Sequence, residues 1–143
     1  MNAVAATVAV ETALTRFVDN ADGTITDTRT GLVWSKATNS AKNVTHKKAE
    51  KLCADLDLAG HTDWRLPTIE ELFALADRSK VRPAIDTNAF PDTKSDWYWS
   101  STVHASDSSY AWVVHFGYGF ALDLHRDDGS AFVRAVRASP AGQ

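Results

Sequence analysis

The sequence predicts an α+β domain in which two helices pack on a small twisted antiparallel sheet. Three observations support this prediction. Short β-prone runs separated by turn residues occupy residues 16–34, two amphipathic segments with capping signals follow between residues 45 and 76, and β-prone runs fill the last third of the chain. Because the helices are grouped rather than alternating with strands, the order indicates α+β and not a parallel βαβ arrangement.

The first part of the domain is predicted to be a meander of small hairpins. Its three β-prone runs lie at residues 17–18, 24–26 and 32–34. Stretches rich in Asp, Asn, Thr and Gly, at residues 19–23 and 28–31, separate the runs and are expected to form the turns.

Two helices are predicted from their capping signals. Thr45 precedes a segment whose apolar residues recur on one face up to about Leu56, so Thr45 is expected to cap a helix. Thr68 and Glu71 have capping-box spacing at the start of a second helix, which has an apolar side through Ala76.

Side chains in and near these helices carry further expectations. His46 and the lysines that follow it are expected on the solvated face of the first helix. Cys53 is the only cysteine, which excludes an intrachain disulfide, and its helical spacing indicates a buried hydrophobe. Arg65 is expected to form a structural ion pair with Glu70 or Glu71, or with a carboxylate on the sheet.

The last third of the chain is predicted to form the antiparallel sheet. A loop-like stretch at residues 80–95 precedes it. Residues 117–119, Gly-Tyr-Gly, form a tight hairpin connection, and residues 127–130 form a second turn. The predicted strands occupy residues 97–101, 111–116, 120–124 and 132–138.

Composition limits the classes of function. The 143 residues, 44% of them hydrophobic, suit one globular domain with one core. A formal net charge of -3 gives no basic field, so nucleic acid is not expected as a partner. No run is long and apolar enough for membrane insertion. Residues 1–15 are assigned to an arm or linker without the basic start of a secretory signal, and residues 139–143 to a tail.

Five sequence blocks occur in an order and spacing that resemble a known family. Together they resemble the Lcl C-terminal-domain-like family, named for a bacterial collagen-like adhesin and similar in fold to C-type lectins and to formylglycine-generating enzymes. The resemblance implies a C-type-lectin-like binding domain over residues 16–138, in a cell-surface, secreted or virion-associated protein. The blocks are RFVDNADGTITDTRTGLVW, DWRLPTIEEL, YWSST, YAWVVHF and VRAVR, at residues 16–34, 63–72, 98–102, 110–116 and 133–137.

The residues present do not indicate an enzyme. The five histidines form no HxxxH or HxH pair, although His115 and His125 are candidates to meet across the hairpin between them. Formylglycine-type oxidases use a pair of cysteines, which this chain lacks, and the sugar-binding calcium motifs of true C-type lectins are also missing. No cofactor is expected. A weak calcium site at Asp123, Asp127 and Asp128 stays open beside the simpler interpretation as solvated turn residues.

The candidate binding surface lies on the last sheet. Alternation along residues 112–116 predicts Trp112, Val114 and Phe116 in the core, with Val113 and His115 facing out. Whether the next strand's apolar side chains face solvent or core is open. The predicted ligand-binding residues are Val113, His115, Tyr118, Phe120, Leu122, Leu124, His125, Arg126, Asp127 and Asp128.

The same region has an unusual composition. Residues 113–131 contain no Lys, Glu, Gln, Met or Trp, the five residues that an Asn codon ending in a pyrimidine cannot reach when its adenines are randomised. Variable proteins of diversity-generating retroelements diversify C-type-lectin-like domains in this way. Chance is the alternative, since Lys and Glu are depleted in strands generally.

Two functional hypotheses follow. The first is a non-catalytic recognition domain that binds a protein or glycan ligand through a variable surface on its last sheet. The alternative is an adhesin tip that assembles as a homotrimer and binds polysaccharide. The net charge of -3 opposes an anionic polysaccharide as the ligand.

Overall fold

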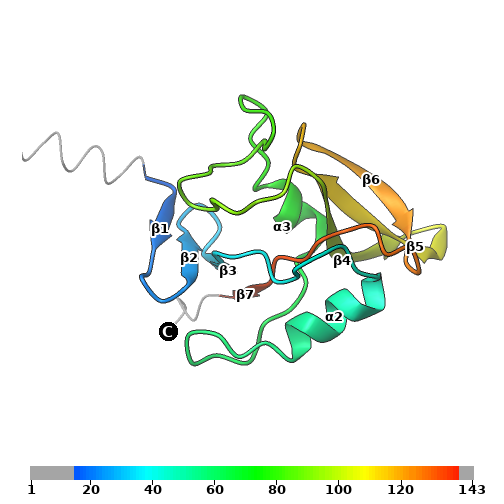
Figure 1. Ribbon diagram of the computed structural model, residues 1–143, viewed down its shortest axis with the longest axis horizontal. Helices are drawn as coiled ribbons and strands as arrows, with labels where there is room; N and C mark the ends of the chain where they lie inside the picture. The colour runs from blue at the N-terminus through cyan, green and yellow to red at the C-terminus, as the bar shows by residue number, and fades with distance from the viewer. Residues whose placement is uncertain (1–14, 139–143) are drawn as a thin grey trace, which may run out of the picture.

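The computed structural model describes residues 15–138, which form a small α+β domain with two helices and two antiparallel sheets (Figure 1). The predicted arm, apart from Thr15, and the predicted tail lie outside the described residues. The first sheet has the order β1-β2-β3-β7 and consists of β1 (Phe17–Asp19), β2 (Thr24–Asp27), β3 (Leu32–Ser35) and β7 (Val136–Ala138).

The second sheet has the order β4-β5-β6 and consists of β4 (Trp97–His104), β5 (Asp107–His115) and β6 (Phe120–His125). The expectation of one sheet is therefore wrong. The closing run predicted at residues 132–138 is divided between the sheets: Phe132 bridges Tyr98 of β4, whereas Val136 pairs with Trp34 of β3. Its last three residues alone form a strand, because the chain crosses from one sheet to the other between these two contacts.

Both helices begin where the sequence predicts. Helix α2 (His46–Ala54) is capped by Thr45, whose side chain accepts from the Lys48 N–H. Helix α3 (Ile69–Phe73) has the predicted capping box formed by Thr68 and Glu71. Glu71 also receives two hydrogen bonds from Arg65, which confirms the structural ion pair. No helix among residues 15–138 has the length and apolar character needed to cross a membrane.

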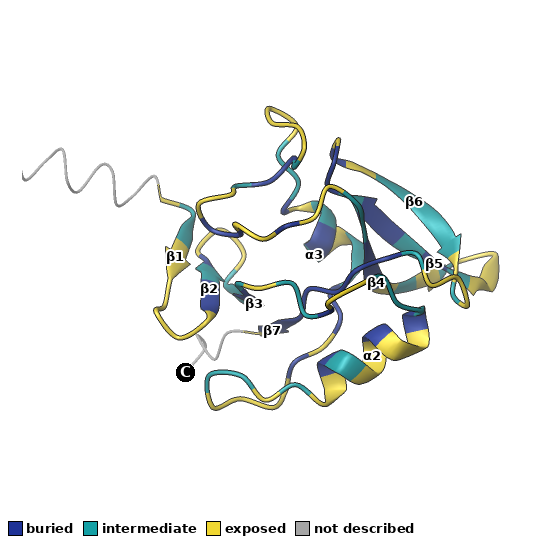
Figure 2. Ribbon diagram, viewed as in Figure 1, coloured by how far each residue is buried: buried dark blue, intermediate teal, exposed yellow. Residues whose placement is uncertain are grey.

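The second sheet has a packed core on each of its faces. Figure 2 shows buried stretches in β4 and β5, whereas β6 is intermediate to exposed. Val114 belongs to a cluster that includes Leu72 and Leu75 at α3. Val113, its neighbour on β5, belongs to a second cluster that includes Ala49 and Cys53 of α2. Because consecutive strand residues point to opposite faces, burial on both sides fixes the sheet between the two clusters.

Cys53 is buried, as the sequence predicts, and burial raises the pKa of its thiol to about 12. The thiolate is the reactive form of cysteine, so this side chain is a packing residue of the second cluster rather than a nucleophile.

Arg134 joins the two halves of the domain from a buried position. Its side chain is 0% exposed, and it donates to the carbonyl oxygens of Ser35 and Lys36 at 2.7 and 2.6 Å. It also donates to Thr93 Oγ1 at 3.0 Å and lies 3.3 Å from Asp92 Oδ1. One guanidinium therefore ties the end of β3 to the loop that leads into β4.

We expect Arg134→Leu to lower the free energy of unfolding by about 3 kcal/mol or more, because buried carbonyl acceptors would lose their donors. Urea unfolding followed by tryptophan fluorescence measures the change. Arg29→Leu is the matched control, since Arg29 is exposed and its side chain makes no hydrogen bond or ion pair with the described residues. Equal losses in the two variants would contradict the structural role of Arg134.

Candidate functional site

The turn that joins β5 to β6, at residues 116–119, is held by contacts on several sides. Phe116 is fully buried in the core, and the N–H of Gly119, which has φ +81°, donates to the His115 carbonyl at 2.8 Å. The loop before β4 contributes further hydrogen bonds, among them one from Arg82 N–H to the Gly117 carbonyl at 2.7 Å and one from Arg78 Nε to the Gly119 carbonyl at 3.1 Å. The turn is thus fixed at both its base and its tip.

Four rings gather beside this turn and form what we call the aromatic platform: Trp97, His115, Tyr118 and Phe120. The His115 ring lies at the centre, 4.6 Å from Trp97 edge-on, and stacked at 5.3 Å on Phe120 and 5.9 Å on Tyr118. The guanidinium of Arg82 lies over the Tyr118 ring at 5.8 Å. The rings are accessible: Tyr118 is 56% and Phe120 40% exposed.

Strand register explains why these residues share a face. Trp97 pairs with His115, and His115 pairs with Phe120, so the three side chains point the same way. Phe120 faces solvent, whereas Leu122 and Leu124 are half-buried on the same face against the α2-side cluster, which answers the question left open by the sequence. Trp97 was missed as a site residue, because its place beside His115 depends on pairing between strands.

Val113 does not belong to the binding surface. It was predicted to face out, but it is 0% exposed and pairs with Leu122 within the second core cluster. Trp112, predicted in the core, lies outside both clusters and is half-buried, stacked on His104 at 5.4 Å. Side chains along β5 do alternate between the two faces, as predicted. However, both faces of the sheet are covered, one near α2 and the other near α3, so the alternation alone could not show which side chains are exposed.

The predicted site residues divide between the two faces of the sheet. His125 pairs with Tyr110 and His115 with Phe120, at opposite ends of β5 and β6 and on opposite faces. The expected meeting of the two histidines across the hairpin is therefore wrong. We call the second group, on the face opposite the platform, the distal face; it comprises His104, Tyr110, Trp112, Asp123 and His125.

Arg126 has mainly structural contacts. Its Nε donates to Nδ1 of His46 at 3.1 Å, and its NH1 group donates to the Ser108 carbonyl at 3.3 Å. Since arginine only donates, His46 accepts at Nδ1 and donates from Nε2 to the Ser100 carbonyl at 2.9 Å. His46 is 1% exposed, so its predicted place on the solvated face of the helix is wrong.

Burial lowers the pKa of His46 from its ordinary value of 6.5, opposed by the hydrogen bond to Ser100 and the charge of Glu50. The neutral ring is the form that both hydrogen bonds require. The α2–β6 junction, which positions Arg126, therefore depends on an uncharged histidine.

The three aspartates considered for calcium each have separate contacts. Asp123 lies 3.9 Å from His104, Asp127 lies 4.0 Å from His125, and Asp128 accepts a hydrogen bond from Ser130. Within residues 15–138, no three His, Cys, Asp or Glu side chains are grouped as a metal ion would require.

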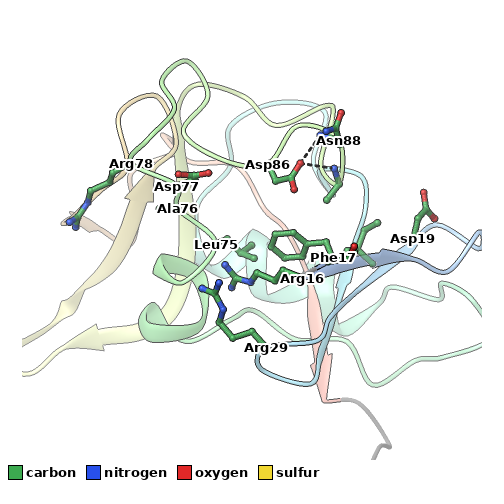
Figure 3. A pocket seen from close by; sticks show the side chains of 13 residues that line it. Arg16, Phe17, Asp19, Arg29, Leu75, Ala76, Asp77, Arg78, Asp86 and Asn88 are labelled. Carbon is green, nitrogen blue, oxygen red and sulfur yellow. Dashed lines mark hydrogen bonds between the residues drawn. The ribbon is translucent and has the colours of Figure 1, made fainter. Parts of the chain in front are cut away.

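A cavity of about 650 Å³ lies away from the aromatic platform, between β1, the end of α3 and residues 86–89 (Figure 3). Its charged side chains have structural partners, with the exception of the exposed Arg29. Arg16 forms a two-pronged pair with Asp27, and Asp86 accepts from the backbone N–H groups of Asn88 and Ala89. The cavity is therefore a feature of the junction between the first sheet and α3, and none of the predicted ligand-binding residues lines it.

The fold and the site define a small mixed α+β domain that displays aromatic side chains on a fixed hairpin. The family model of the Lcl C-terminal domain matches residues 23–137, and the chain belongs to this family. Comparison with curated proteins gives no match.

We expect the domain to lose stability as the pH falls below 6.5. The folded state keeps His46 neutral to a lower pH than the unfolded chain does, so the unfolded state binds the extra proton in this range. The loss contributed by His46 is at most about 1.4 kcal/mol per pH unit, and it ends at the folded pKa. Urea unfolding at a series of pH values measures it.

In His46→Gln this part of the pH dependence should disappear, whereas His61→Gln, at an exposed position, should retain it. A wild-type profile that is flat below pH 6.5, or one unchanged by His46→Gln, would show that His46 does not stay neutral in the folded state.

Proposed function

We propose that this chain is a non-catalytic recognition domain that binds a protein or glycan ligand through the aromatic platform. The observation that carries the proposal is the accessible cluster of Trp97, His115, Tyr118 and Phe120 on a turn that the loop before β4 holds in place. Exposed aromatic rings are costly to leave in water, and aromatic residues dominate the binding energy of protein interfaces.

The distribution of exposed apolar side chains supports this site. Five large hydrophobic residues are exposed in residues 15–138: Val18, Val81, Val103, Tyr118 and Phe120. Tyr118 and Phe120 belong to the platform, and Val81 precedes Arg82, which contacts the turn through its backbone and its guanidinium. Three of the five therefore gather at one hairpin. Because this hairpin is already held by hydrogen bonds, binding there requires little ordering of the chain.

At His115 and Ser100, hydrogen bonding favours recognition over catalysis. His115 Nδ1 accepts from the Gly117 N–H at 3.0 Å, and Ser100 Oγ donates to the Trp112 carbonyl at 2.7 Å. A hydrolytic site needs a nucleophile hydrogen-bonded to a base. These groups instead stabilise the turn and the strand irregularity of β4.

The finer features of the proposal are a C-type-lectin-like fold and a surface diversified by a retroelement. The placement of β7 in the same sheet as β1, with two helices and a separate three-stranded sheet, supports the first. Residues 115, 118 and 120–128 are all at least partly accessible, whereas Val113, Val114 and Phe116 are buried, as expected for variable positions on a constant frame.

We expect a near-copy of the DNA for residues 113–131, rich in AAC or AAT codons, close to a reverse-transcriptase gene. Sequencing the surrounding genomic DNA measures this directly. If the DNA contains neither the near-copy nor the reverse transcriptase, the depletion of Lys and Glu in this segment is chance.

The alternative is a homotrimeric adhesin tip that binds polysaccharide. Membership of a family named for a collagen-like adhesin supports it. The negative net charge opposes a sulfated ligand, so a neutral glycan suits this alternative better. Molar mass in solution distinguishes a trimer from a monomer, and a glycan array, with and without calcium, distinguishes sugar ligands from protein ligands.

We expect Tyr118→Ala and Phe120→Ala each to weaken binding by about 2 kcal/mol, because each removes an exposed ring from the platform. Once an array or a pull-down identifies a ligand, isothermal titration calorimetry measures the change. Thermal unfolding should remain within a few degrees of wild type, since both residues are substantially exposed.

Val18→Ala and Val103→Ala are matched controls, because these residues are about as exposed as Phe120 and lie outside the platform. Their affinities should equal that of wild type. Unchanged binding in both platform variants would refute the platform as the ligand site, and equal losses in the controls would show a non-specific effect of surface hydrophobicity.

A further inference from the structure

The charge of the protein is concentrated on the second sheet. Residues 97–128 contain four aspartates and one arginine but no lysine or glutamate. The formal charge of this segment, -3, equals that of the entire chain, so the positive and negative charges of the remaining residues cancel. The single cation, Arg126, is held by His46 and Ser108 and lies 3.7 Å from Glu50. The strands of the second sheet, together with the turns at their ends, therefore carry a net negative charge.

The distal face combines this charge with aromatic rings that no core covers. Trp112 and Tyr110 are half-buried and belong to neither core cluster. His104 stacks on Trp112, and His125 contacts Tyr110 edge-on at 5.2 Å. No cation of the described residues lies over the ring of Trp112 or of Tyr110. The rings that do have an arginine over them are those of Phe17, Phe73, Phe90, Tyr98 and Tyr118.

A carboxylate lies directly beside these rings. Asp123 pairs in register with Trp112 and points to the same face, with its side chain 40% exposed and its Oδ2 atom 3.9 Å from Nε2 of His104. A guanidinium can stack on an aromatic ring while its N–H groups bind a carboxylate. The indole of Trp112 and the carboxylate of Asp123 lie side by side on this face, so together they suit a guanidinium group.

The edge of the sheet adds backbone groups to this surface. Strand β6 is the last strand of its sheet, and no described segment pairs with its outer edge. The Arg126 N–H donates to the Ser109 carbonyl and continues the register of the β5–β6 pairing. Because every second residue of an antiparallel edge strand bonds to its neighbour, the backbone groups of residues 120, 122 and 124 also bond to β5. The backbone groups of Ala121 and Asp123 therefore point to the open edge, where an extended peptide can add as a further strand.

We propose that the distal face and the open edge of β6 bind an extended cationic peptide segment, with an arginine or lysine side chain placed over Trp112 and against Asp123. This proposal rests on the proposed role of the second sheet as a recognition surface, but it uses the face opposite the aromatic platform. Charge complementarity is the reason for choosing a cationic peptide as the ligand, because an acidic surface repels an anionic glycan and attracts a basic peptide segment.

A short fluorescein-labelled peptide of alternating Thr and Arg is the probe, because alternation places every Arg on one face of an added strand. Fluorescence anisotropy on the intact chain should show saturable binding that weakens as salt is raised, and much weaker binding of the matching Thr–Glu peptide. Asp123→Asn should weaken binding of the Arg peptide about tenfold. Asp57→Asn, the same charge change at an exposed position in the loop after α2, should leave it within about twofold.

Tyr118→Ala separates this proposal from the proposed function. It should leave Arg-peptide binding unchanged while it weakens binding of the platform ligand. The proposal is overturned if the Arg and Glu peptides bind equally, if neither binds, or if Asp123→Asn and Asp57→Asn have the same effect, which would indicate bulk charge attraction. None of these outcomes affects the platform, which is tested by its own variants.

Discussion

The buried guanidinium of Arg134 is the interaction on which the two-sheet arrangement depends. It lies where the chain leaves the second sheet for the first, and it binds the carbonyl groups that end β3 and the polar side chains of the loop that precedes β4. Burying a charge is costly unless it is paired and hydrogen-bonded, and here the two terminal NH groups have partners on both segments while Nε has none, so both segments must be in place around the guanidinium. The relative position of the sheets is thereby fixed, and with it the loop that leads to β4.

The hydrogen bonds of the turn between β5 and β6 extend this fixed geometry to the aromatic platform. The second sheet is packed on one face against α3 and on the other against α2. Phe116 anchors the base of the hairpin, and the loop from Arg78 to Ala84 bonds to the backbone at its tip. Side chains beyond the reach of these cores, Tyr118 and Phe120 on one face and Trp112 on the other, are left accessible.

Residues of the candidate site illustrate how far sequence patterns reach. Period-two alternation placed His115 correctly on the outer side beside the turn, but it left open whether Phe120 faces solvent, which the pairing of Phe120 with His115 decides. The same reasoning misplaced Val113 and Trp112, since alternation separates two faces but does not say which is covered, and here each face is covered at one end. His46 was misplaced because a helix start rich in lysine suggests solvent, whereas the Ser100 carbonyl and Arg126 hold this ring inside.

By itself the sequence determined much of the local structure: both helix N-caps, a structural ion pair at Arg65, the strands of the hairpins and the family, since each depends on residues close together in the chain or on ordered blocks. It left open which carboxylate Arg65 binds. The tertiary structure alone decided that β7 joins β3, that Trp97 completes the aromatic platform and that His115 and His125 lie on opposite faces. These features depend on contacts between residues far apart in the chain, which are selected by the packing of both cores around one buried arginine.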